Sequence, residues 1–541
     1  MQIFLYSDAS QSELCLTRSP FRSSYSHKQK TCISTGRFLF LFLHLSHILV
    51  LGDLLPYPFI HIKMGFTSII ARLLLGTVAI LSFVGAINEQ DFAPDDIVIR
   101  DICILGGGST GTYAAISLKD KAKSVVVVER HKILGGHTET LYLGNNQYID
   151  YGVEGVFNDE LSRKYLKRLA VDYKPLLPST QTTEYVNFRT GKKVPPPSGI
   201  PSVVEAAKVY RAAIEKFSYL KDGLYNLPDP VPEELLQPFG DFVKKTGIEG
   251  SLQVVKIFTH GVGNILQAPL LRVLQLCGLP QVDSLLQGGY ITPKNGMYEV
   301  YNRASEILGS DIFYETSVIE TERSESGINI FVQSANGIRK LIKAKQLLVT
   351  FVPIIESLNG FDLVRPESSL FQKWNWVNYY VAVVKNTGMP NATTLVNADP
   401  DNTPGNLPLP PFQLELQYPG VDGYLVSKII GNSTFTAQQA KDLILSDLRR
   451  MGTEGTFPGG DPEIVVFGDH TPTTVSVSNI DVRDGFYRKL SALQGTKNTF
   501  YTGLAFCSDY SSLLWAYTET VIGEMVASSA STCSLCVQGY D

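Results

Sequence analysis

Residues 97–129 decide the fold of this chain. They read IVIRDICIL over Ile97–Leu105, GGGSTG over Gly106–Gly111, TYAAISLKD over Thr112–Asp120 and SVVVVE over Ser124–Glu129. A β-rich apolar run leads into a glycine-rich turn, a helix of small residues and a second strand that ends in an acid. This order predicts a βαβ unit that binds a dinucleotide.

Each residue of the turn has a physical task in such a unit. Gly106 allows the tight turn, Gly108 lets the pyrophosphate approach the backbone, and Gly111 lets helix and strand pack closely. Ser109 and Thr110 open the helix, whose free N–H groups and positive dipole end favour phosphate. We therefore expect a Rossmann-type cofactor site on these five residues.

The residues after the second strand extend the predicted site. Glu129 is placed to accept both ribose hydroxyls, and the chain continues RHKILGGH over Arg130–His137 and YIDYGVEG over Tyr148–Gly155. This wording resembles the flavin amine oxidase superfamily, in which an acid, an arginine and a Gly-Gly pair continue the FAD site. Here His137 stands where that family usually has arginine. The resemblance implies FAD as cofactor, with these further contacts: Arg130, Gly136, His137, Gly152, Val153 and Glu154.

Two later segments fit the same superfamily. Val318, in IFYETSVIETE, matches the strand position where the family's backbone meets the adenine. Gly503 and the helix predicted over Trp515–Val526 match its last FAD motif, and Thr520 is expected among the contacts. The sequence of the first unit is similar to that of a fungal secondary-metabolism branch, the β-cyclopiazonate dehydrogenase-like family. The resemblance covers roughly residues 97–526.

The resemblance implies an α/β fold in which a Rossmann-type FAD-binding domain is interleaved with a substrate domain of mixed sheet and helices. The FAD-binding parts are expected at 97–156, 290–353 and 491–526. The substrate domain is expected at 157–289, which reads mainly as helices, and at 354–490, which reads mainly as a sheet.

The substrate half holds the predicted catalytic groups. A flavin accepts the hydride itself, so the protein has to position the substrate and exclude water. Many amine oxidases place a lysine near the flavin, but the matching strand, Trp376–Val384, contains none. His470 is predicted as a base and Tyr380, with Tyr379, as a pocket residue. Cys507 is either a covalent flavin attachment point or a small buried thiol. His137 is the alternative attachment point.

Composition narrows the function classes. A chain of 541 residues is long enough for two interleaved domains, and a net charge of -5 leaves no basic footprint for nucleic acid. No set of residues has zinc-type ligand spacing, so no metal site is expected. Cys533 and Cys536, in the tail 527–541, form either a redox dithiol, a terminal disulfide, or part of a disordered tail.

The N-terminus carries a compartment signal. Residues 64–86 begin with Met64, continue through Arg72 and an apolar centre, and end in small residues at Ala86, as in a secretory signal peptide. Residues 1–63 then read as a gene-model extension or a disordered leader; the rival interpretation is a membrane anchor built from the apolar runs. Asn391 and Asn432 lie in glycosylation sequons. A secreted or secretory-lumenal protein is expected.

Three functions remain open from the sequence. The first is FAD-dependent oxidation of a small amine-bearing or alkaloid metabolite. The second is thioether oxidation by an enzyme resembling prenylcysteine oxidase. The third is a flavin-binding protein without turnover, which the missing lysine keeps open.

Overall fold

The computed structural model describes residues 88–177, 181–197 and 201–537, with side chains described except at 260 and 529–537. The predicted leader 1–63 and signal peptide 64–86 lie outside the described residues, as do the side chains of Cys533 and Cys536. None of the helices in the described part is long and apolar enough to cross a membrane. The described residues all belong to one compact unit.

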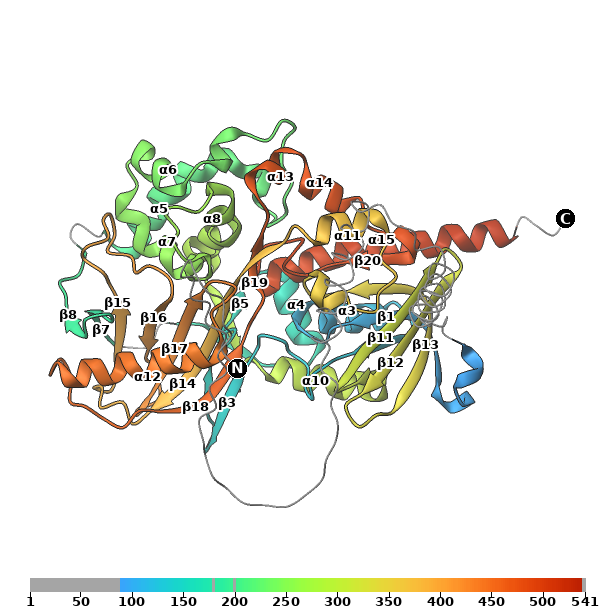
Figure 1. Ribbon diagram of the computed structural model, residues 1–541, viewed down its shortest axis with the longest axis horizontal. Helices are drawn as coiled ribbons and strands as arrows, with labels where there is room; N and C mark the ends of the chain where they lie inside the picture. The colour runs from blue at the N-terminus through green and yellow to red at the C-terminus, as the bar shows by residue number, and fades with distance from the viewer. Residues whose placement is uncertain (1–87, 178–180, 198–200, 538–541) are drawn as a thin grey trace, which may run out of the picture. The chain divides into compact units, whose positions relative to one another are not determined.

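A seven-stranded sheet forms the core of the predicted cofactor half (Figure 1). Its parallel part runs β10-β2-β1-β13-β20, and β11 and β12 continue from β13 as an antiparallel meander. The strands are β1 (Ile97–Leu105), β2 (Val125–Val128), β10 (Ile312–Phe313), β11 (Thr316–Ser324), β12 (Gly327–Ser334), β13 (Arg339–Val349) and β20 (Thr499–Tyr501).

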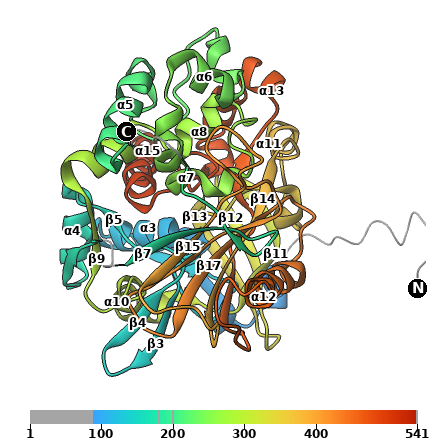
Figure 2. The ribbon, with the colours of Figure 1, turned by 90° about the vertical axis from the view of Figure 1, so that its left-hand side faces the viewer.

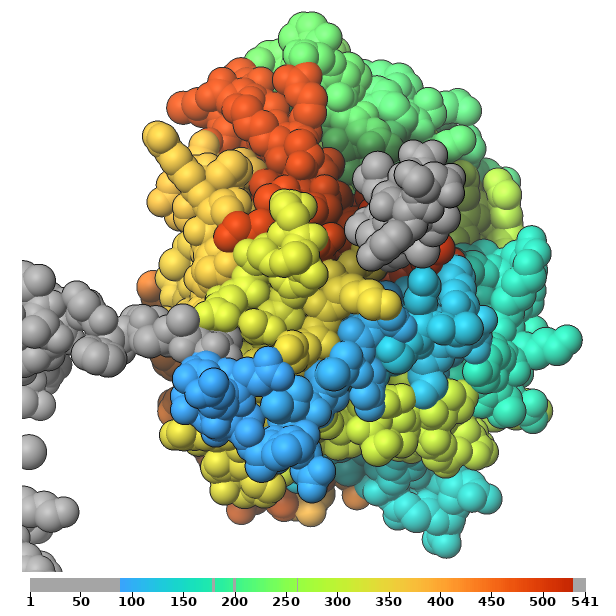
Figure 3. All heavy atoms as spheres, turned by 90° about the vertical axis from the view of Figure 1, so that its right-hand side faces the viewer, coloured from blue at the N-terminus to red at the C-terminus, as the bar shows by residue number. Residues whose placement is uncertain are grey.

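This sheet interleaves three distant parts of the chain. Strand β1 pairs with β13 on one side and with β2 on the other, so the 97–156 and 290–353 parts share one sheet. The 491–526 part adds β20 and the start of α15 (Ser511–Val537), and α15 packs on α3 (Ser109–Asp120). Figure 3 shows the three parts side by side on one face, in blue, yellow and red. The predicted α/β FAD-binding fold is confirmed.

An eight-stranded sheet forms the predicted substrate half, in the order β18-β14-β17-β16-β15-β7-β8, with β19 beside β14. One of its faces is covered by α12 (Ala437–Thr453), whose apolar side packs on the strands (Figures 1 and 2). The strands are β7 (Thr182–Asn187), β8 (Lys192–Lys193), β14 (Asn375–Lys385), β15 (Thr393–Asn397), β16 (Phe412–Gln417), β17 (Tyr424–Gly431), β18 (Glu463–Asp469) and β19 (Thr473–Ser476).

Strands β7 and β8 are a difference from the sequence expectation, because they come from the part expected to be mainly helical. Strand β7 pairs in parallel with β15, more than 200 positions away in the chain. Its sequence, TTEYVN, is short and mostly polar, so it forms a strand because it pairs with β15. The expected helices of that part do form: α5 (Val203–Ile214), α6 (Phe239–Thr246), α7 (Leu252–Thr259), α8 (Leu270–Leu276) and α9 (Leu279–Asp283).

Prolines mark the starts of several helices in this part. Pro238 and Pro269 are the N-cap residues of α6 and α8, and Pro280 is in the first turn of α9. Proline lacks the N–H that a helix interior needs but is tolerated at a helix start. Helices α13 (Asn479–Arg483) and α14 (Phe486–Ser491) complete this helical layer, which lies over the sheet in Figure 2.

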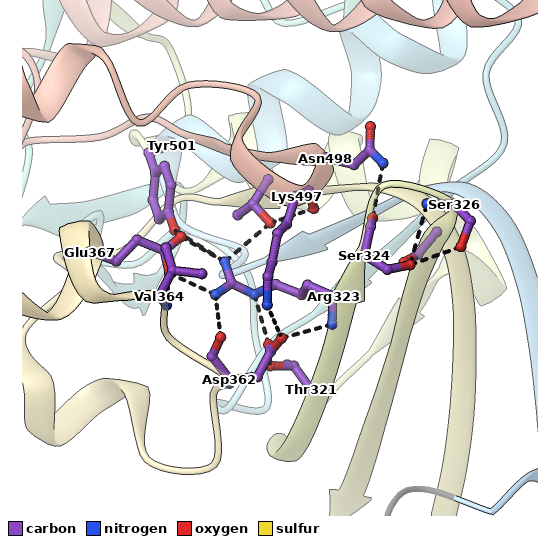
Figure 4. A network of polar contacts seen from close by, with 12 residues as sticks. Thr321, Arg323, Ser324, Ser326, Asp362, Val364, Glu367, Lys497, Asn498 and Tyr501 are labelled. Atoms are coloured by element: carbon purple, nitrogen blue, oxygen red, sulfur yellow. Dashed lines mark hydrogen bonds and ion pairs between the residues drawn. The ribbon is translucent and has the colours of Figure 1, made fainter.

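Smaller elements connect the two halves. Strands β3 and β4 form a hairpin, β5, β9 and β6 form a three-stranded sheet, and a buried ionic network around Arg323 ties β11 to the region of β20 (Figure 4). The remaining bounds are β3 (Thr140–Gly144), β4 (Gln147–Asp150), β5 (Val156–Phe157), β6 (Tyr173–Pro175), β9 (Tyr290–Pro293), α4 (Glu160–Arg168), α10 (Glu299–Leu308) and α11 (Arg365–Phe371).

Candidate active site

The glycine-rich turn after β1 forms the cradle that the sequence predicts. Gly106 has φ +101°, a conformation that L side chains rarely adopt. A Cβ on Gly111 would overlap the carbonyl oxygen of Gly106, so helix and turn touch only because Gly111 has no side chain. Thr350, at the end of β13, donates its hydroxyl to the same carbonyl oxygen at 3.0 Å. The turn is thus fixed from two sides.

The N-terminus of α3 is open to a ligand. Gly108 is the N-cap and provides no side-chain cap for the first N–H groups, which belong to Ser109 and Thr110. A Cβ on Gly108 would lie 3.7 Å from Cα of Gly136, an ordinary contact, so no protein neighbour requires glycine there. Space left by Gly108 in front of an uncapped helix fits a pyrophosphate, which is the fit expected of FAD.

Glu129 ends β2 as predicted and is buried. One carboxylate oxygen accepts the backbone N–H of Gly107 at 2.6 Å, and the other accepts that of His131 at 2.7 Å. Each oxygen has a second lone pair, so the carboxylate keeps capacity for the ribose hydroxyls. Arg130 is exposed beside it, and its Nε donates to the ring of His131.

The C-terminal helix meets this cradle at its first turns, through Ser511 and Trp515. The hydroxyl of Ser109 donates to that of Ser511 at 3.2 Å and accepts the indole N–H of Trp515 at 3.0 Å. Helix α15 begins at Ser511, four residues before the predicted start. Thr520 is therefore more than two turns from the helix start and exposed, so the structure places it apart from this cradle contact, and its contact with the cofactor stays a prediction.

Gly503 and Val318 lie in the loop after β20 and on β11. Gly503 has φ +105°, and a Cβ there would lie 2.8 Å from the carbonyl oxygen of Thr350. The loops after β20 and β13 therefore approach each other closely. Val318 is half-buried near the start of β11, and Thr316 on the same strand donates its N–H to the carbonyl oxygen of Glu129. The contacts of Gly503 and Val318 with the cofactor stay predictions.

The segment Gly152–Glu154 packs against the backbone of His137. A Cβ on Gly152 would overlap the carbonyl oxygen of His137, and the N–H of Val153 donates to that same oxygen at 3.3 Å. Glu154 then pairs with Lys428 on β17 at 3.1 Å. The segment therefore links the cofactor half to the sheet of the substrate half.

The structure brings the two predicted histidines together. The rings of His137 and His470 stack with centroids 4.4 Å apart and 10° between their planes. Nε2 of His470 lies 3.0 Å from a carboxylate oxygen of Glu139. A Cβ on Gly468, two residues before His470, would overlap the Glu139 carboxylate. The contact between His470 and Glu139 therefore depends on glycine at position 468.

Burial decides the charge states of this cluster. It lowers the pKa of both histidines to about 4 and raises the pKa of Glu139 to about 7. The contact between His470 and Glu139 is therefore a hydrogen bond of a neutral imidazole, and Glu139 gains or loses its proton near neutral pH. Asp509, which accepts the hydroxyl of Thr473 at 3.3 Å, also has a pKa raised by burial.

The predicted pocket residue Tyr380 is on the wrong face of its strand. Its hydroxyl donates to the carbonyl oxygen of Phe435 at 2.7 Å, and its ring packs in the cluster beneath α12. The neighbouring Tyr379 points to the opposite face, because successive side chains of a strand alternate. Its ring lies 5.7 Å from that of His470. Tyr379 therefore replaces Tyr380 as the candidate.

Lys428 is a site residue that the sequence analysis missed. No lysine lies between Trp376 and Val384, but Lys428 on the adjacent strand β17 contacts Glu154 at 3.1 Å and Glu415 at 3.2 Å. It pairs in register with Val381, which places it on the same face as Tyr379. The available signal was a lysine inside the apolar strand YLVSKIIG.

Cys507 is a buried free thiol, and burial raises its pKa to about 12. A thiol of such high pKa forms little thiolate and is a poor nucleophile. Of the two interpretations of Cys507, the structure supports the small buried thiol. In the described part of the chain, no group of three or more His, Cys, Asp or Glu residues has the arrangement of a metal site.

A glycine cradle, an uncapped helix and a buried acid define a dinucleotide-binding fold, and a family comparison identifies its kind. The family model for flavin containing amine oxidoreductase matches residues 110–375. β-Cyclopiazonate dehydrogenase of Aspergillus oryzae is 43% identical over 460 residues, covering 85% of this chain and 99% of the relative. The FAD-dependent oxidoreductase oblC of Cochliobolus heterostrophus is 33% identical, covering 84% and 97%.

Solved structures agree on the fold. A fatty acid isomerase from P. acnes superimposes with a TM-score of 0.63 at 19% identity, over 79% of this chain and 98% of the isomerase. Cyclohexylamine oxidase from Brevibacterium oxydans gives a TM-score of 0.55 at 17% identity, over 79% and 99%. This chain belongs to the flavin containing amine oxidoreductase family and is an FAD-dependent oxidoreductase.

Proposed function

We propose that this enzyme oxidises a small amine-bearing or alkaloid metabolite by hydride transfer to the flavin. The observation that carries the proposal is the 43% identity to β-cyclopiazonate dehydrogenase over nearly the whole length of that relative. Bound FAD supplies the hydride acceptor. The protein must then hold the substrate and take up the proton that leaves with the hydride.

The pair of His470 and Glu139 provides the proton acceptor. His470 borders Tyr379 and His137, whereas Glu139 stands behind it at 3.0 Å. With its pKa near 7, Glu139 is deprotonated at slightly alkaline pH and accepts a proton through His470. His470 is then the group that meets the substrate: it takes the proton on one ring nitrogen and passes the proton of its Nε2 to Glu139.

This assignment predicts an acid limb in the pH profile. Below about pH 7 the rate of flavin reduction should fall about tenfold per pH unit, because protonated Glu139 no longer accepts a proton. His470→Gln should lower the rate by about 10²–10⁴-fold with flavin content unchanged. Glu139→Gln should remove the acid limb; rapid-mixing measurements of flavin reduction over a pH series read both effects.

Glu463→Gln is the matched control, since Glu463 is an exposed carboxylate on β18 that pairs with Lys385. It should keep the wild-type profile. An acid limb that persists in Glu139→Gln would show that another group accepts the proton.

Substrate class is tested by anaerobic bleaching of the flavin's visible absorption band. β-Cyclopiazonate and related alkaloids should bleach the band of the protein expressed from Met64, whereas a prenylcysteine thioether should not. Bleaching by the thioether alone would favour the second candidate, a thioether oxidase. A stable yellow protein that no member of the panel bleaches would favour a flavin-binding protein without turnover.

We also propose that the enzyme enters the secretory route through residues 64–86 and is glycosylated. Asn391 and Asn432 are both exposed, as a glycan requires. N-terminal sequencing of the protein secreted by a fungal host should start just after Ala86. Glycosidase treatment should lower its mass, and the Asn391→Gln, Asn432→Gln double variant should abolish that shift.

A further inference from the structure

Arg272 is a half-buried cation in the helical layer above the substrate sheet. It lies on α8, and one guanidinium nitrogen, Nη2, donates to the carbonyl oxygen of Thr474 at 3.0 Å. Its Nε is buried and has no hydrogen-bond partner among the described residues. Guanidinium offers five N–H donors, so this side chain retains most of its capacity for an acceptor.

No carboxylate in the described part of the chain forms an ion pair with Arg272. Its electrostatic neighbours are the phenols of Tyr225 and Tyr487, whose rings stack at 3.7 Å with 3° between their planes. Burial lowers the pKa of Arg272, but a guanidinium starts so high that it keeps its charge at neutral pH. A buried guanidinium nitrogen without a hydrogen-bond partner is costly, and proteins normally provide one.

Arg323 shows how this same protein treats a structural buried arginine. Glu367 receives two of its N–H groups at 2.7 and 2.8 Å, and Asp362 accepts a third at 2.8 Å. The contrast indicates that the partner of Arg272 comes from outside the chain.

Arg272 lies beside the candidate active site. Thr474, its carbonyl partner, has φ +47°, an uncommon conformation for a threonine, and follows Thr473, whose hydroxyl contacts Asp509. Tyr225 has both Arg272 and Asp509 among its electrostatic neighbours, and Asp509 in turn neighbours His137. Burial raises the pKa of Asp509, so this carboxyl group resists carrying the charge that would compensate Arg272.

We propose that Arg272 binds an anionic group of the substrate, a carboxylate or an enolate, and thereby orients the substrate toward His470. The planar guanidinium donates two parallel hydrogen bonds to such a group, and the paired rings of Tyr225 and Tyr487 cover its apolar neighbourhood. This inference rests on the proposed function and adds to it a charge requirement: the metabolite carries a negative group remote from the carbon that is oxidised.

The test uses the FAD-loaded enzyme and two probes of equal shape, benzoate and its neutral amide, benzamide. Titration calorimetry, with perturbation of the flavin spectrum as a second readout, should show benzoate binding about 10- to 100-fold more tightly than benzamide. Equal affinities, or no benzoate binding up to millimolar concentration, would overturn the proposal. Neither readout requires turnover, so the result stands even if the alkaloid assignment fails.

Variants then locate the charge. Arg272→Gln should abolish the preference for benzoate while flavin content and Tm stay unchanged, and Arg272→Lys should retain part of it, because lysine keeps the charge but not the fork. Arg211→Gln is the matched control on the same layer, since Arg211 pairs with Asp283 at 2.5 Å and is partly exposed. If Arg272→Gln does not fold, the lysine variant decides: full wild-type preference in it would contradict bidentate binding.

With β-cyclopiazonate as substrate, the same variants should raise KM more than they lower kcat. A loss of kcat alone, with KM and benzoate affinity unchanged, would assign Arg272 a merely structural role. Absence of turnover in the wild type together with a benzoate preference would leave the anion site intact and reject the proposed substrate.

Discussion

Gly111→Val should yield a folded protein that purifies without flavin colour. Even a single Cβ at this position would overlap the carbonyl oxygen of Gly106, and valine adds two methyl groups beside Thr350. Relief requires α3 to move away from β1, which withdraws the helix N-terminus from the phosphate position. Because overpacking and lost phosphate contacts act together, the affinity for FAD should fall about 100-fold or more.

The measurement is the FAD content of purified protein, followed by titration of the apoprotein with FAD. Gly523→Ala on α15 is the control, because no atom lies within 4 Å of a Cβ placed there and alanine is a better helix former than glycine. Gly523→Ala should keep its full flavin content. Wild-type affinity in Gly111→Val would mean that the turn after β1 does not position the phosphates.

The cofactor half was predictable because its signals are local. In 97–129, the glycines and the final acid lie within one short segment, and the structure reproduces that strand–turn–helix–strand order. The helix start at Ser511 was not found, since two serines and two leucines form no distinctive cap signal. A helix start placed at Ser511 would have drawn attention to Ser511 and Trp515, which contact Ser109.

The candidate catalytic residues were harder to choose for a geometric reason. Tyr379 and Tyr380 must point to opposite faces of β14, but both faces of this strand are covered, so hydrophobicity does not tell which face meets the flavin. The tertiary position of α12 beneath Tyr380 shows that this residue is packed away from His470. By contrast, His470 was singled out by its residue type, although its partner Glu139 is 331 positions away and could not be foreseen.

A charged residue inside an apolar run is a usable sequence signal even before its partner is known. Lys428 in YLVSKIIG and Arg272 in LLRVLQL both interrupt hydrophobic elements. Such a residue has to find an acid, a carbonyl oxygen or a ligand. The sequence shows that such a charge requires a partner, but long-range packing decides which kind of partner it meets. Lys428 meets the acids Glu154 and Glu415. For Arg272 we infer a ligand.

Glu367→Ala should destabilise the protein by about 3–5 kcal/mol, the largest stability effect that we expect of a single substitution. The side chains of Arg323 and Glu367 are fully buried, and Glu367 holds the guanidinium through both oxygens (Figure 4). Its carboxylate also accepts the hydroxyl of Tyr501 at 2.6 Å and the N–H of Val364 at 3.0 Å. Removing it leaves one buried cation half-paired, with Asp362 as its remaining acid.

The network explains why the effect should extend beyond one contact. Arg323 lies on β11, Glu367 on α11 and Tyr501 on β20, so one guanidinium ties two strands of the cofactor half to a helix of the 354–490 part. Chemical unfolding of the FAD-loaded protein measures the loss, and Asp229→Ala, which removes an exposed ion pair with Arg488, should leave the unfolding midpoint unchanged. An equal loss in Glu367→Gln would assign the effect to the charge. Near-normal stability in that variant would instead show that shape and hydrogen bonding suffice, because glutamine keeps one acceptor oxygen for Arg323 while giving up the ion pair.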